Sequence, residues 1–136
     1  MGFDQYHEPP QELSAQTRTF ARMCASLTEE AEAIGWYEQR ISVETDAEAI
    51  AIMHAAQGEE FKHFSMDLEL LLRRTPKWRE IAKGVLFQDG DIVEHGEASE
   101  AAADSDMPAA AVVAPAGDAS AASGSLGIGD LRGAGR

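Results

Sequence analysis

Apolar side chains recur every seven residues near the start of the chain, and this repeat constrains the fold more than any other feature. The repeat comprises Leu13, Phe20, Leu27, Ile34 and Ile41. A second line, three residues further along, comprises Met23, Glu30 and Tyr37. Lines spaced in this way form a single stripe on an α-helix. The sequence therefore predicts a long amphipathic helix from about Glu12 to Arg40, and Ser14 or Glu12 can serve its first turn.

Two more helices are predicted after the first. Thr45 is the expected N-cap of a helix that runs from about residue 46 to Arg74, with Glu48 completing a capping box. Pro76 ends that helix, because proline disfavours helical geometry in the residue before it. It also suits the start of a short third helix that reaches about Phe87. No alternating strand pattern competes, so the predicted class is all-α: an antiparallel two-helix hairpin with a short third helix.

A two-helix hairpin has one internal interface and leaves half of its apolar surface in water. Its helices would be about 40 Å long, at roughly 1.5 Å per residue. A core this small calls for oligomerisation. The simplest solution is a homodimer in which two hairpins pair about a two-fold axis as a four-helix bundle.

The chain divides near residue 88 into parts of different composition. Residues 1–88 hold 15 acidic and 9 basic residues, whereas residues 89–136 hold 9 and 2, and no aromatic residue lies beyond Phe87. A segment without aromatics buries too little apolar surface to offset its ordering entropy. We therefore expect a hairpin domain over 1–88, a flexible acidic Ala-rich linker over 89–123, and a terminal peptide over 124–136, so that the C-terminal tail is disordered.

Charge and composition exclude several classes of function. A net charge of −13 argues against nucleic acid and against an anionic membrane surface as partners. One cysteine, Cys24, excludes an internal disulfide framework and a Cys-rich metal site, and it is expected to be a small buried residue. There is no apolar run of about 18 residues, and the polar N-terminus does not resemble a secretory signal. We expect a soluble, cytosolic protein.

Three side chains suggest a metal centre. Glu30 occupies a position in the apolar stripe, where an unpaired carboxylate is costly to bury. Glu60 and His63 are spaced i, i+3 and share one face of the second helix. Di-iron carboxylate bundles take a Glu from each of two helices and a Glu-x-x-His from each of the other two. This chain supplies half of that set, so a dimer would complete it. The alternatives are a solvated Glu-x-x-His pair and a Glu30 that reaches the edge of a wide stripe.

Several neighbouring residues admit two interpretations each. Glu29 and Glu32 could form an electronegative funnel for divalent cations, or a solvated helix face. Tyr37 could hydrogen-bond a ligand carboxylate, or belong to the core. Asp67 could orient His63 from one turn away.

The last residues of the chain have the pattern of a docking peptide. Leu126, Ile128 and Leu131 alternate with glycines and polar residues at the end of the linker. Such a tethered segment can place its apolar side chains in pockets on a partner.

Two segments carry a resemblance to a known family. Residues 125–132, Ser-Leu-Gly-Ile-Gly-Asp-Leu-Arg, resemble the targeting peptide that directs cargo into encapsulin shells. Residues 29–40 and 59–63, with Glu-Glu-Ala-Glu-Ala-Ile-Gly-Trp-Tyr-Glu-Gln-Arg and Glu-Glu-Phe-Lys-His, resemble the encapsulated ferritins. The two motifs are independent and stand in the expected order.

The resemblance implies a half-length ferritin fold whose two-fold dimer completes a four-helix ferritin-like bundle, with five dimers in a ring. It implies a ferroxidase whose di-iron centre takes Glu30, Glu60 and His63 from both chains, with Tyr37 nearby. Metal would enter past Glu29, Glu32 and Trp36, a site that could also hold Ca²⁺. The chain would oxidise Fe(II) with dioxygen and supply iron for mineral storage inside an encapsulin nanocompartment in the cytoplasm, to whose shell Leu126, Ile128 and Leu131 would bind.

The pattern departs from the family at two positions. Family members often carry Glu where this chain has Lys62 and His near Ala55, and these residues form an additional outer metal site. The departures argue against that outer site here. Two other functions stay open from the residues alone: a non-enzymatic helical-hairpin interaction module, and a dimer stapled by a structural metal such as zinc.

Overall fold

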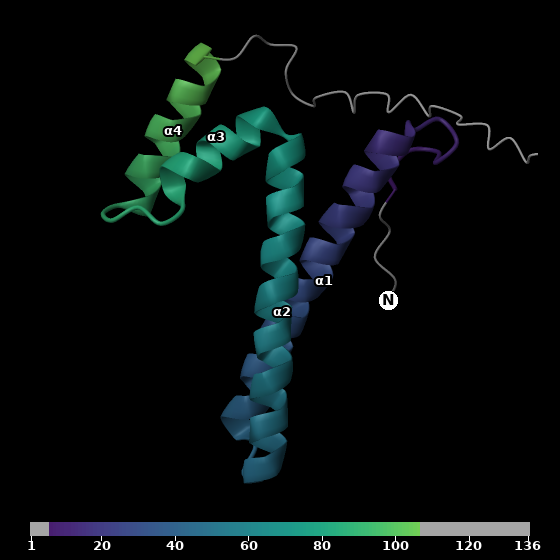
Figure 1. The fold of residues 1–136 in the computed structure, drawn as a ribbon, viewed down its shortest axis with the longest axis vertical. Coiled ribbons are helices and arrows are strands. Elements are labelled where there is room, and N and C mark those ends of the chain that lie inside the picture. The colour runs from purple at the N-terminus through teal and green to yellow at the C-terminus, as the bar shows by residue number, and fades with distance from the viewer. Residues whose placement is uncertain (1–5, 107–136) are drawn as a thin grey trace, which may run out of the picture.

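Four α-helices, and no strand, make up the part of the chain that the structure describes. It is a computed structural model that describes residues 6–106. The helices are α1 (Ala15–Val43), α2 (Ala47–Arg74), α3 (Pro76–Val85) and α4 (Ile92–Asp106). α1 and α2 form an antiparallel hairpin, α3 turns away from the end of α2, and α4 lies beside α3 (Figure 1). The predicted all-α class is confirmed.

Local hydrogen bonds define the hairpin ends. Ser14 caps α1 by accepting from the backbone N–H of Thr17 at 3.0 Å. The expected cap at Thr45 is wrong, because Asp46 caps α2 and accepts from the N–H groups of residues 48 and 49 at 2.9 Å. Thr45 instead belongs to the loop, where its N–H and that of Asp46 donate to the Glu44 carboxylate at 2.7 and 2.9 Å.

The helix boundaries otherwise follow the sequence closely. α1 continues to Val43 rather than ending near Arg40, which shows that the β-branched residues there did not stop it. Pro76 stands in the first turn of α3, and Arg73 and Arg74 lie in the last turn of α2, both as predicted.

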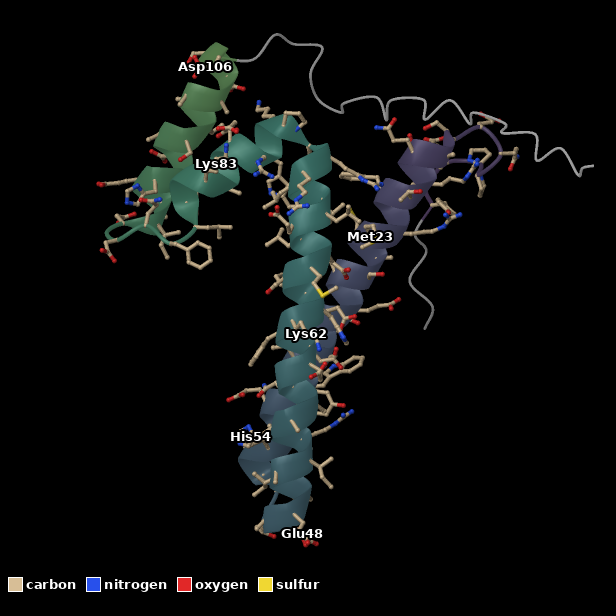
Figure 2. The ribbon with its side chains drawn as sticks, viewed as in Figure 1. Met23, Glu48, His54, Lys62, Lys83 and Asp106 are labelled. Carbon is tan, nitrogen blue, oxygen red and sulfur yellow. The ribbon has the colours of Figure 1, made fainter. Side chains whose placement is uncertain are left out.

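Very few side chains are fully buried in this single chain. The buried apolar residues among those described are Ala25, Leu71, Leu72 and Ala103, and the buried polar residue is Gln57. Large apolar side chains remain exposed along the hairpin, namely Trp36, Val43, Ile52, Phe61 and Met66. Side chains project away from both helices over the length of the hairpin (Figure 2). The hairpin therefore leaves apolar surface uncovered, as its small core predicts.

α4 lies inside the stretch 89–123, for which the sequence predicts a flexible linker. Asp91 caps it by accepting from the N–H groups of residues 93 and 94 at 2.8 and 3.0 Å. α4 packs on α3 through Gly84, whose missing Cβ makes room for Ser99, and Ala103 is 3% exposed. Lys77 forms an ion pair with Asp104 across the two helices. The rest of the predicted linker and the terminal peptide 124–136 lie outside the described residues.

None of the helices within residues 6–106 combines the length and the hydropathy needed to cross a bilayer.

Candidate metal centre

Glu30, Glu60 and His63 come together where α1 and α2 face each other. Glu30 projects from α1, and Glu60 and His63 project from successive turns of α2. One ligand atom from each residue lies within 4.8 Å of the other two. Lys62, the neighbour of His63, is labelled in Figure 2 in the middle of the hairpin, where the two helices overlap in that view. The predicted trio is thus assembled within a single chain.

The centre opens toward solvent. His63 Nδ1 lies 3.2 Å from Glu60 Oε2 and 3.9 Å from Glu30 Oε2. The Glu30 and Glu60 side chains are 23% and 21% exposed, whereas His63 is 46% exposed. The two carboxylates therefore line the hairpin, and the imidazole marks the open side of the group.

A hydrogen bond links the two carboxyl groups and shifts their pKa values in opposite directions. A hydrogen bond between Glu30 and Glu60, helped by burial and by the charge of Glu60, raises the pKa of Glu30. The same hydrogen bond, together with one from His63, lowers the pKa of Glu60. Of the two carboxyl groups, Glu30 therefore keeps a proton to higher pH than Glu60 does.

The donor set suits a divalent transition metal. Two carboxylate oxygens and one imidazole nitrogen fit Fe, Mn or Zn, whereas a purely oxygen set would favour Mg or Ca. Like charges this close are unfavourable unless a proton or a cation lies between them. A cation bound here would offset the repulsion between the two carboxylates, and three protein ligands would leave coordination positions open.

The other residues singled out in the sequence lie outside this trio. Glu29, Glu32 and Trp36 are exposed on α1, and within residues 6–106 no second group of three metal-ligating side chains is as close together. Tyr37 is half-buried, with the Arg40 guanidinium 5.6 Å from its ring centre.

Asp67 and Cys24 were also singled out. The charge of Asp67 contributes to the raised pKa of Glu30. The sequence predicts an interaction of Asp67 with His63 instead. Cys24 is half-buried rather than buried, and burial raises the pKa of its thiol.

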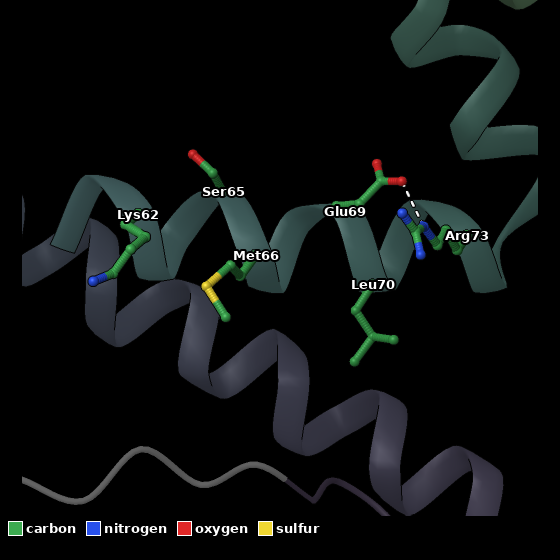
Figure 3. Close-up of a pocket in the computed structure, with 6 residues that line it drawn as sticks. All are labelled: Lys62, Ser65, Met66, Glu69, Leu70 and Arg73. Carbon is green, nitrogen blue, oxygen red and sulfur yellow. Dashed lines mark hydrogen bonds and ion pairs between the residues drawn. The ribbon is translucent and has the colours of Figure 1, made fainter. Parts of the chain in front are cut away.

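A shallow groove of about 410 Å³ runs along α2 beside the centre. Figure 3 shows Met66 and Leu70 pointing toward α1, whereas Ser65 and Glu69 point away from it. An ion pair between Glu69 and Arg73 closes one end of the groove at 2.6 Å. The groove has an apolar floor and holds none of the three ligands, so it is not part of the metal centre.

Comparisons with known proteins agree with this geometry. A family model described as EncFtn-like matches residues 5–89. The chain is 39% identical to an "Encapsulated ferritin-like protein" of Rhodospirillum rubrum over 127 residues, which cover 93% of this chain and 87% of that protein. It is 43% identical to a "Ferritin-like protein" of Thermotoga maritima over 91 residues, which cover 67% of this chain and 80% of that protein.

A solved structure is also similar. The crystal structure of protein ne0167 from Nitrosomonas europaea superposes with a TM-score of 0.64 at 40% sequence identity, and the match covers 65% of this chain and 98% of that one. The matched family region contains the hairpin and all three candidate ligands.

Proposed function

Because this chain belongs to the EncFtn-like family, we propose that it is a ferroxidase, which oxidises Fe(II) to Fe(III) with dioxygen at a di-iron centre shared by two copies of the chain. The observation that carries the proposal is the cluster of Glu30, Glu60 and His63 within 4.8 Å. One copy supplies half of the ligands of a di-iron carboxylate site, and a second copy related by a two-fold axis supplies the other half.

Charge supports the pairing of two half-sites. Two copies bring together four carboxylates, from Glu30 and Glu60 of each chain. When all four are ionised, their total charge of −4 balances two divalent ions. Neither half-site alone offers enough ligands to hold two metal ions, so the second copy completes the chemistry.

The exposed surface of the hairpin supports the same dimer. Met66 follows His63 by three residues and so lies on an adjoining face of α2, and it is 63% exposed. Ile52, fourteen residues before Met66 and therefore on the same face of α2, is 70% exposed. A second hairpin would cover these side chains and would enclose the open side of the centre.

Each ligand has a distinct role in this proposal. Glu60, whose pKa is lowered, would bridge the two irons as a carboxylate. Glu30 and His63 would complete the ligands of each iron. Iron is the substrate: each Fe(II) gives up one electron, dioxygen accepts the electrons, and the Fe(III) product leaves for mineral storage.

The flanking residues extend the proposal outward. Tyr37 is one turn beyond Ile34 on α1 and would hydrogen-bond a ligand carboxylate in the assembled dimer. Glu29, Glu32 and Trp36 are exposed, and they would form the site through which Fe(II) enters and at which Ca²⁺ could bind.

The partners form the last part of the proposal. Five dimers would assemble into a ring inside an encapsulin shell, in the cytoplasm. Leu126, Ile128 and Leu131 would bind that shell; the similar Rhodospirillum rubrum protein is described as encapsulated. Deletion of residues 124–136 should then abolish loading into the shell and leave iron oxidation by the free protein unchanged.

Oxygen consumption with Fe(II) tests the enzymatic proposal. Glu60→Ala, Glu30→Ala and His63→Ala should each reduce oxidation to the rate of the buffer, with helix content retained. Glu59→Gln is the matched control, because Glu59 is the exposed neighbour of Glu60 and pairs with Lys62. It should oxidise Fe(II) at the parental rate.

The same samples separate the competing functions. Bound metal that tracks the number of dimers, together with rapid oxidation, supports the shared di-iron centre. Parental oxidation by Glu60→Ala would show that the proposed centre is wrong. A dimer that binds metal through Glu30 but consumes no oxygen would be a metal-stapled dimer instead.

A further inference from the structure

Gln57 is the one polar side chain that is buried among the described residues, at 6% exposure. Its neighbours on α2, Gly58 and Glu59, are both exposed. A buried amide is unfavourable unless its polar atoms find partners. The partners of Gln57 therefore indicate why this position is polar.

Gln57 joins the two helices of the hairpin through its side-chain amide. Its Nε2 donates to the backbone oxygen of Ile34 at 3.3 Å and to Glu38 Oε2 at 3.1 Å, and both acceptors belong to α1. The Ile34 oxygen already has a helical donor four residues on, so Gln57 uses its second lone pair. The amide thus adds a directional link without disturbing either helix.

This link lies in the layer next to the metal centre. Gln57 precedes Glu60 by three residues, and Ile34 follows Glu30 by four, so both lie about one turn closer to the loop. A slip of one residue between the helices would shift them by roughly 1.5 Å and turn the side chains by about 100°. The 4.8 Å grouping of the three ligands would not survive such a slip.

Apolar packing between the helices is incomplete in this half of the hairpin. Between Glu30 and Glu60 no apolar residue is buried, and the buried apolar residues Ala25, Leu71 and Leu72 lie on the other side of the centre. Gly35 and Gly58 flank the link, and a Cβ at either would meet no atom within 4 Å. The half-buried apolar side chains here, such as Ile34, Ile50 and Met53, pack without directional preference, whereas the Gln57 hydrogen bonds are directional and break when the helices shift.

We propose that Gln57 is a positioning residue that sets the register of α1 against α2 and so holds Glu30 opposite Glu60 and His63 for metal binding. The inference rests on the proposed metal centre. Buried polar groups that specify register, often at some cost in stability, are known from other helical assemblies. Gln57 does not bind the metal, because its amide donates to α1 and not to the ligand group.

Gln57→Leu in the full chain tests this role, with Co²⁺ as the probe. The substitution removes both hydrogen bonds and keeps a side chain of similar size. It strands no buried partner, because Glu38 is exposed and the Ile34 oxygen keeps its helical donor. We expect Co²⁺ to bind about tenfold more weakly or worse, with a changed d–d spectrum. The midpoint of thermal unfolding should stay equal or rise.

Gln39→Leu is the matched control. Gln39 is exposed, and its Nε2 donates to the oxygen of Gly35 within α1 at 3.2 Å. This variant should bind Co²⁺ with parental affinity and give the parental spectrum.

A charge swap supplies the rescue. Gln57→Glu places a carboxylate against that of Glu38 and should weaken Co²⁺ binding. Adding Glu38→Gln restores one amide–carboxylate hydrogen bond between the helices, with donor and acceptor exchanged, and should recover most of the affinity. A double variant that binds no better than Gln57→Glu would overturn the proposal.

The outcomes for Gln57 and for iron oxidation are separable. Parental Co²⁺ affinity in Gln57→Leu, or a loss matched by an equal loss in Gln39→Leu, would overturn the positioning role and leave the ferroxidase proposal standing. A parent chain that binds Co²⁺ but does not oxidise Fe(II) would refute the ferroxidase proposal. The Co²⁺ affinities of Gln57→Leu and the parent chain would still test the positioning role of Gln57.

Discussion

Gly84→Ala should weaken the packing of α4 on α3. A Cβ built on Gly84 would lie 2.8 Å from the Ser99 Cβ of α4, and the Ser99 hydroxyl is closer still. Real Cβ atoms do not approach so closely, so either Ser99 or the whole of α4 must move. Overpacking of this kind costs roughly 1–3 kcal/mol, and alanine returns about 0.5–1 kcal/mol of helix propensity. The net loss is about 1.5 kcal/mol, or roughly tenfold in the equilibrium for opening α4.

Native-state amide hydrogen exchange measures this opening helix by helix. We expect α4 amides to lose about tenfold in protection and α1 and α2 amides to stay unchanged, because α4 packs on α3 alone among the described helices. Adding Ser99→Gly to Gly84→Ala removes the opposing side chain and should restore part of the protection, because the new glycine itself lowers the helix propensity of α4.

Gly96→Ala is the matched control within α4. A Cβ at Gly96 meets nothing within 4 Å, so only the gain in helix propensity remains, and protection should rise by a few-fold. The same rise in Gly84→Ala would refute the close contact between α3 and α4.

Three further predictions concern stability and pH. Leu71 is 1% exposed, so Leu71→Ala should lower the free energy of unfolding in urea by about 2–5 kcal/mol, whereas Leu86→Ala, at a residue 40% exposed, should change it far less. Hydrogen bonds from the N–H groups of Asp46 and Thr45 lower the pKa of Glu44. The stability that Glu44 contributes is therefore present above its pKa in the unfolded chain and is lost as pH falls through its pKa in the folded protein. Glu44→Ala should flatten that part of the curve of stability against pH. Because the pKa of Glu30 is raised, a proton competes with metal for this carboxylate at low pH, so Co²⁺ affinity should fall as pH drops through that pKa. Calorimetric titration over a series of pH values should show this fall, and Glu30→Gln should make it shallower.

The sequence predicts the hairpin and the grouping of Glu30, Glu60 and His63 because both depend on helical periodicity. Glu60 and His63 share a face of α2 from their spacing alone, and Glu30 stands out as a polar residue in an apolar stripe. The start of α3 at Pro76 is equally local. Once the two helices pair antiparallel, the seam position of Glu30 brings it to the other two.

α4 was not predictable in the same way. Its stabilising contact is the approach of Gly84 to Ser99, two small residues fifteen positions apart, which leaves no periodic signal in the sequence. The N-cap of α2 differed for a similar reason. Thr45 and Asp46 are both good caps, and the Glu44 carboxylate decides between them by holding the N–H groups of both residues in the loop.

Gln57 carries the same signal that identified Glu30. Residues 50, 57, 64 and 71 form a heptad line along α2, and Gln57 is its polar member among Ile50, Phe64 and Leu71. A chain selected only for a stable hairpin would carry an apolar residue at both Glu30 and Gln57, since each polar group in the seam needs a partner. Glu30 on α1 and Gln57 on α2 instead lie within about one turn of each other along the hairpin, and each faces the other helix. Local rules are most often broken where function requires it. Because the two exceptions lie at one level of the hairpin, we infer that the functional site lies at this level and not on the apolar surface on either side of it.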